Sequence, residues 1–95
     1  MKSETLNTHL EELCERAGYT IRKERGSFRG DSCLMQGDRL IVINKSRPVD
    51  TQNMILANIL RDVEIEDLYI KPAVRKEIRA MWDRLDQFES EPDDS

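Results

Sequence analysis

The chain has 95 residues and a mass of 11.1 kDa, which is enough for one domain and too little for two. Charged residues make up 36% of it, apolar residues make up 38%, and the mean hydropathy is −0.67, so one modest core is possible. No apolar run approaches the roughly 18 residues of a membrane-spanning helix. The polar start of the chain is also unlike a signal peptide. We therefore expect a cytoplasmic protein with no membrane partner.

Few residues suited to catalysis or metal binding are present. His9 is the only histidine, which excludes sites that need two, and Cys14 and Cys33 are too few for a disulfide framework. Cys14 lies on the apolar face of a predicted helix and is expected in the core. An enzyme based on Cys33 would require that thiol to be exposed with a low pKa. We expect no enzyme activity, no cofactor and no bound metal.

Charge is unevenly distributed along the chain. Residues 1–15 carry a net charge of −3, residues 16–47 carry +5, and residues 48–95 carry −6, which together give −4. An acidic chain is a poor general binder of nucleic acid, but its middle segment is locally basic.

Apolar periodicity predicts a first helix over residues 3–17, capped by Ser3 and ended by Gly18. Alternation then predicts a half-buried strand over 19–23, followed by a glycine-containing loop over 24–31. Two further strands, 32–36 and 39–44, flank a hairpin signal at Gly37-Asp38. The last strand is apolar on both faces and rich in β-branched residues, so it is expected at the centre of the sheet. Three strands in a row predict an antiparallel meander.

Two helices are predicted in the second half of the chain. The first spans about 51–62 with Asp50 as its cap, and the second begins at Pro72 after a short link over 64–71. The predicted order is α-β-β-β-α-α, an α+β fold with a three-stranded antiparallel meander and helices packed on one face. We expect a single domain over 1–88 and a disordered acidic tail over 89–95.

The basic middle segment contains the clearest candidate binding site. Its cations surround an aromatic residue in a loop made flexible by glycine, a combination that suits phosphate or carboxylate groups. The alternative interpretation is a solvated loop whose charges balance the acidic helices or tail. The candidate partner-binding residues are Arg22, Lys23, Arg25, Phe28 and Arg29.

The middle of the chain also resembles a known family. The strand 41–44 reads IVIN, and the following helix reads LANILRD over 56–62. Residues 19–63 are thereby similar to minimal metallopeptidases with an HExxH zinc motif, which cleave phage-type repressors and stress regulators. In that pattern Asn58 and Asp62 stand at the zinc-histidine positions, and Ile59 stands at the general-base glutamate position. Since Ile59 cannot accept a proton and Asn58 is a poor zinc ligand, the resemblance implies a scaffold without its catalytic centre.

A second resemblance is to small bacterial proteins of similar length that contain the sequence YIKPAVR, here residues 69–75. It implies no function. The leading hypothesis is therefore a non-catalytic binding or adaptor module whose basic loop, residues 22–29, contacts an acidic protein or a nucleic acid. The alternative is a catalytically inactive metallopeptidase-like scaffold that binds peptide at a sheet edge. Salt dependence discriminates between them, because phosphate contacts weaken steeply with salt and main-chain pairing does not. The sequence does not indicate an oligomeric state.

Overall fold

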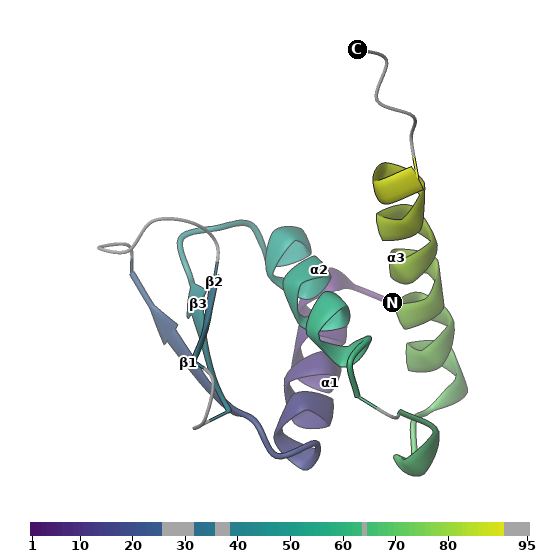
Figure 1. Ribbon diagram of the computed structural model, residues 1–95, viewed down its shortest axis with the longest axis horizontal. Coiled ribbons are helices and arrows are strands. Elements are labelled where there is room, and N and C mark those ends of the chain that lie inside the picture. Colours follow the sequence, from purple (N-terminus) through teal and green to yellow (C-terminus); the bar gives the residue numbers. More distant parts are fainter. Residues whose placement is uncertain (26–31, 36–38, 64, 91–95) are drawn as a thin grey trace.

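The described part of the chain forms three α-helices and three strands (Figure 1). The computed structural model describes residues 1–25, 32–35, 39–63 and 65–90, with only the backbone described at 32–35, 66 and 88–90. In chain order the elements are α1 (Ser3–Arg16), β1 (Thr20–Glu24), β2 (Ser32–Met35), β3 (Leu40–Asn44), α2 (Val49–Leu60), a short 3-10 helix η1 (Ile65–Asp67) and α3 (Pro72–Ser90). The chain is thus a mixed α+β fold with three helices. None of the described helices is both long enough and apolar enough to cross a bilayer.

The sheet is mixed, and the predicted antiparallel meander is wrong. The strand order is β1-β3-β2, so β3 lies between the other two. β1 pairs parallel with β3, in a register that places Thr20 opposite Leu40 and Glu24 opposite Asn44. Only β2 pairs antiparallel with β3, and this agrees with the predicted hairpin. Gly37 and Asp38, the predicted turn residues, lie outside the described residues.

The apolar character of β3 explains this topology. A meander would place β2 in the centre, whereas the observed order places β3 there, with Ile41 and Ile43 fully buried. A central β3 requires β1 and β2 to flank it. Since the hairpin makes β2 antiparallel to β3, a connection from β1 to β2 that passes the end of β3 makes β1 parallel to β3. The end of β1 and the start of β2 lie at this end of β3, two strand spacings apart, about 10 Å.

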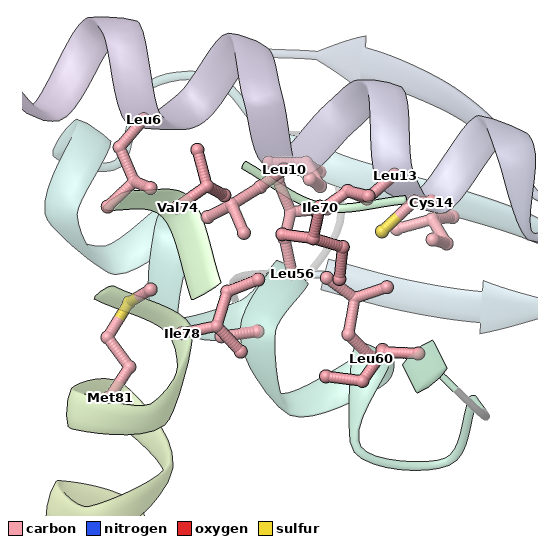
Figure 2. Packing of buried hydrophobic residues seen from close by; sticks show 14 residues of the cluster. Leu6, Leu10, Leu13, Cys14, Leu56, Leu60, Ile70, Val74, Ile78 and Met81 are labelled. Carbon is pink, nitrogen blue, oxygen red and sulfur yellow. The ribbon is translucent and has the colours of Figure 1, made fainter. Parts of the chain in front are cut away.

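The helices cover one face of the sheet and enclose the core. In Figure 1, α1 and α2 lie between the sheet and α3. Leucines of α1 and α2 meet α3 residues in this layer, as Figure 2 shows for Leu10, Leu56 and Ile78, each of which is fully buried. The core therefore depends on all three helices, and the single-domain prediction is compatible with this continuous cluster.

The caps of α1 and α2 differ from those predicted. Ser3 and Asp50 were each expected to cap a helix, but the N-caps are Lys2 and Pro48, and neither makes a side-chain capping hydrogen bond. Instead, Ser3 Oγ donates to Asp50 Oδ1 at 2.5 Å. The two residues lie in the first turns of neighbouring helices, so contact between the helices replaces capping within each.

The third helix starts at Pro72 as predicted and extends to Ser90, two residues into the predicted acidic tail. Residues 91–95 lie outside the described residues. Val74, Ile78 and Met81 form its buried stripe, and Trp82 Nε1 donates to the Ala57 carbonyl at 2.7 Å. The indole N–H is thus satisfied while its ring packs against the core.

The end of α1 supports a first prediction. Gly18 has φ +100°, and a Cβ there would come within 3.0 Å of Arg39 Nη1. Gly18→Ala is expected to lower the free energy of unfolding by about 1–2 kcal/mol, because an L-residue is strained at this φ. Urea denaturation measures the change. Gly18→Asn, which tolerates left-handed backbone better, should cost less; an equal cost for both variants would contradict the explanation.

Candidate binding site at the basic end of the sheet

Parallel pairing of β1 and β3 brings two cations to the same end of the sheet. Glu24 lies opposite Asn44 in the register, and the Lys45 amide donates to the Glu24 carbonyl at 3.0 Å. Arg25 and Lys45 therefore leave the sheet side by side, and both are exposed. Neither has an ion-pair partner within the described part of the chain. This end of the sheet is a basic surface whose two cations lie one strand spacing apart, about 5 Å, whereas β2 would separate them by about 10 Å in an antiparallel meander.

The turn from β3 to α2 holds its cations in place. The Asn44 side-chain oxygen accepts from the Ser46 amide at 3.1 Å and from the Ser46 hydroxyl at 2.5 Å. The Arg47 amide donates to the Asn44 carbonyl at 3.1 Å, and Gln52 Nε2 donates to the Arg47 carbonyl at 2.9 Å. This Asn-centred turn fixes the backbone at both of its exposed cations, Lys45 and Arg47. We call Arg25, Lys45 and Arg47 the basic end.

The five residues predicted from the sequence occupy different environments. Arg22 lies on β1 with its side chain 61% exposed and pairs with Glu24 at 2.9 Å, so it is close to the basic end. Such an exposed ion pair contributes little to stability and leaves Arg22 available to a partner. Arg25 belongs to the basic end itself. Phe28 and Arg29 lie outside the described residues.

Lys23 is occupied within the fold. Its ammonium group donates to Asn7 Oδ1 at 3.0 Å and pairs with Glu11 at 3.2 Å, both on α1. Asn7 is buried and donates in turn to Asn53 Oδ1 at 2.9 Å, while Asn53 Nδ2 donates to the Ser3 carbonyl at 3.1 Å. Lys23 is therefore the outer member of a polar network that joins β1, α1 and α2.

Arg39 lies away from the basic end. It precedes β3, donates to the Ala17 carbonyl at 3.0 Å, and its guanidinium lies 5.7 Å from the centre of the Tyr19 ring. These contacts hold the start of β3 against the end of α1. The cations of the middle segment are thus divided between the two ends of the parallel strand pair.

The positions that would form a zinc centre in the metallopeptidase pattern carry no such arrangement. Asn58 and Asp62 are exposed, and Ile59 is partly buried against the core. Across the described residues, no group of three or more histidine, cysteine, aspartate or glutamate side chains is arranged to hold a metal ion. The side chain of Cys33 is not among those described.

The sequence did not predict a groove that the structure shows between α1 and the start of α3. It has a volume of about 90 Å³ and is lined in part by His9, Arg16, Tyr69 and Lys71. The Tyr69 side of the groove is held by Arg16 Nη2, which donates to the Tyr69 carbonyl at 3.1 Å. His9 is half-buried at this groove and lies apart from the basic end.

Comparison with protein-family models, with curated proteins and with solved structures finds no match to the chain. The functional argument therefore depends on the geometry of the basic end.

The polar network supports a second prediction. Lys23→Met keeps the length of the side chain but removes the donor to Asn7 and the partner of Glu11. We expect the free energy of unfolding to fall by about 1 kcal/mol, measured by urea denaturation. Arg25→Met, which removes a cation with no described partner, should change it by less than about 0.5 kcal/mol. Equal losses would contradict the distinction between the two cations.

The buried thiol supports a third prediction. Burial raises the pKa of Cys14 to about 12, and the carboxylates of Glu11 and Glu15 contribute to the rise. Because a thiol in an unfolded chain ionises near a pKa of about 8.5, the unfolded state loses its proton first and stability should fall as the pH rises above that value. In a Cys33→Ser variant at pH 8, the remaining thiol should react with a disulfide reagent only as fast as the protein unfolds. Rapid modification of the folded protein would contradict this.

Proposed function

We propose that the chain is a non-catalytic binding module that contacts an acidic partner through the basic end of its sheet. The observation that carries the proposal is the parallel register of β1 and β3, which places Arg25 beside Lys45. Arg47 lies in the turn between β3 and α2, which is held by four hydrogen bonds. Cations whose backbone is already ordered lose little conformational freedom on binding, so a small number of them suffices for recognition.

Electrostatics near α2 favour the same partner chemistry. The helix begins at Val49, two residues after Arg47, and its N-cap, Pro48, makes no side-chain capping hydrogen bond. The positive end of the helix dipole therefore adds to the basic end. Asp50 opposes it in part, but that carboxylate accepts from Ser3 on α1. Two of the predicted contact residues, Phe28 and Arg29, follow Arg25 in the chain and remain part of the proposal.

The partner presents closely spaced anions, as an acidic protein segment or a nucleic-acid backbone does. Net charge distinguishes these two partners: a chain with a net charge of −4 repels a long polyanion over most of its length. A short acidic segment avoids that repulsion. We therefore favour an acidic protein segment over extended nucleic acid.

Binding assays with two probes test this function. A poly-glutamate peptide and a short single-stranded oligonucleotide are titrated against the full chain at several salt concentrations. Arg25→Glu/Lys45→Glu should weaken binding at least tenfold, and Lys71→Glu, a charge reversal just before α3, should leave it unchanged. Three cations that each contact one phosphate of a single strand should give a slope of about −2 in a plot of log binding constant against log salt concentration, at about 0.7 per phosphate. Oligonucleotide binding with such a slope would favour nucleic acid as the partner instead. If the double variant binds both probes as tightly as the wild-type chain does, the proposal is contradicted.

A second candidate function follows from the open edges of the sheet. β1 and β2 each pair only with β3 within the described residues, so each leaves one edge for an added peptide strand. The sequence of β1 carries three charges that discourage such pairing, whereas β2 carries none. Peptide binding that persists in high salt and in the Arg25→Glu/Lys45→Glu variant would support this edge mode and would exclude the basic end as the binding site.

A further inference from the structure

The charges of α3 run against the dipole of the helix. Its first turn contains no acidic residue and its last turn no basic residue. Cations are concentrated in its first half, at Arg75, Lys76 and Arg79, and aspartates at 83 and 86 follow in its second half. Because the N-terminus of a helix is positive and the C-terminus negative, this order destabilises an isolated helix. A sequence that breaks a local rule in this way suggests a compensating contact elsewhere.

Two charged residues of α3 do not follow this division of charge, and the structure places both of them on another face of the helix. Glu77 and Arg84 interrupt the division of charge in the sequence, but both line a cavity of about 320 Å³ against the first turns of α1 and α2. They therefore face the rest of the protein. Asp86 pairs with Arg61, the C-cap of α2. The described side chains of the opposite face of α3 therefore place the cations Arg75, Lys76 and Arg79 in its first half and one carboxylate, that of Asp83, in its second.

That outer face is an open groove. It has a volume of about 510 Å³ and is lined by Pro72, Arg75, Lys76, Arg79, Ala80 and Asp83. In Figure 1, α3 lies on the far side of α1 and α2 from the sheet, and none of the described elements covers its outer side. Lys76, Arg79 and Asp83 are exposed and have no ion-pair partner within the described residues.

We propose that this face pairs with the same face of a second copy of the chain, with the two α3 helices antiparallel. A two-fold axis near Ala80 places Lys76 and Arg79 of one copy on either side of Asp83 of the other, so the carboxylate of each face meets two cations of the other copy. The exposed side chain at the axis is small, which allows the helices to approach closely. Antiparallel packing also opposes the two helix dipoles, so charges that are unfavourable within one helix become favourable between two.

Charge complementarity and the symmetry of the charge pattern on α3 favour a second copy of the chain as the occupant of this groove. A purely acidic partner would satisfy the first half of the groove and be repelled by Asp83 in the second. A second copy satisfies both halves with one arrangement, as an isologous interface requires. Since the contacts are exposed ion pairs around a small-residue centre, the dimer is expected to be weak and sensitive to salt.

Sedimentation velocity of the full chain tests the proposal. At low ionic strength the wild-type chain should dimerise reversibly below about 1 mM and dissociate as salt is added. Lys76→Glu/Arg79→Glu makes the outer face acidic, and Asp83→Lys makes it basic, so each variant alone should stay monomeric. An equimolar mixture of the two should form a heterodimer, because their faces are then complementary.

Matched controls carry the same changes of charge elsewhere. Lys45→Glu on the basic end and Glu15→Lys on α1 should dimerise as the wild type does, and circular dichroism confirms that each variant is folded. A wild-type chain that is monomeric throughout the concentration range would overturn the proposal, as would reversed variants that dimerise unchanged or fail to associate when mixed. None of these outcomes depends on the binding function proposed above, which is assayed with separate ligands.

Discussion

Burial of β3 in the centre of the sheet is the constraint on which the other features depend. Ile41 and Ile43 are fully buried beneath the helices, and Val42 on the opposite face is half covered. A strand with apolar residues on both faces gains most from neighbours on both edges. With β1 and β2 flanking it, β2 pairs antiparallel and β1 parallel with β3, and Arg25 then emerges next to Lys45. The basic end is thus a consequence of core burial.

A buried polar network determines which cations are available at the surface. Asn7 and Asn53 are almost fully buried and hydrogen-bond to each other between α1 and α2. Removing either amide would leave a buried polar group without a partner, so the network specifies how the helices and β1 meet. Lys23 serves this network, whereas Arg25, two residues later, is free of it. Lys23 therefore has a structural role, whereas Arg25 is available at the surface.

The elements that sequence analysis predicts well are those with a strong local signal. The apolar stripe of α1, the left-handed Gly18, the proline start of α3 and the central position of 39–44 are all confirmed. Strand order was wrong because periodicity reports which face of a strand is buried and not which strands are neighbours. The two predicted helix caps failed for a related reason, since Ser3 and Asp50 bond to each other across 47 residues of sequence.

The candidate site could be predicted only in part. Clustering in the sequence drew attention to Arg22 and Arg25, which lie at or near the basic end, but it included Lys23, whose partners on α1 are remote in the chain. Lys45 and Arg47 were not among the predicted residues, because only direct pairing of β1 with β3 places them beside Arg25. Likewise, the charge division of α3 is visible only when Glu77 and Arg84 are assigned to the inner face.

Cross-strand nuclear Overhauser effects in the isotope-labelled full chain test the central claim most directly. Parallel pairing predicts backbone contacts of Ile21 with Ile41 and of Lys23 with Ile43, together with the antiparallel contacts between β2 and β3. It also predicts no backbone contacts between β1 and β2. A ladder of contacts between residues 20–24 and 32–35 in place of the β1–β3 contacts would contradict the account, since β2 would then separate Arg25 from Lys45.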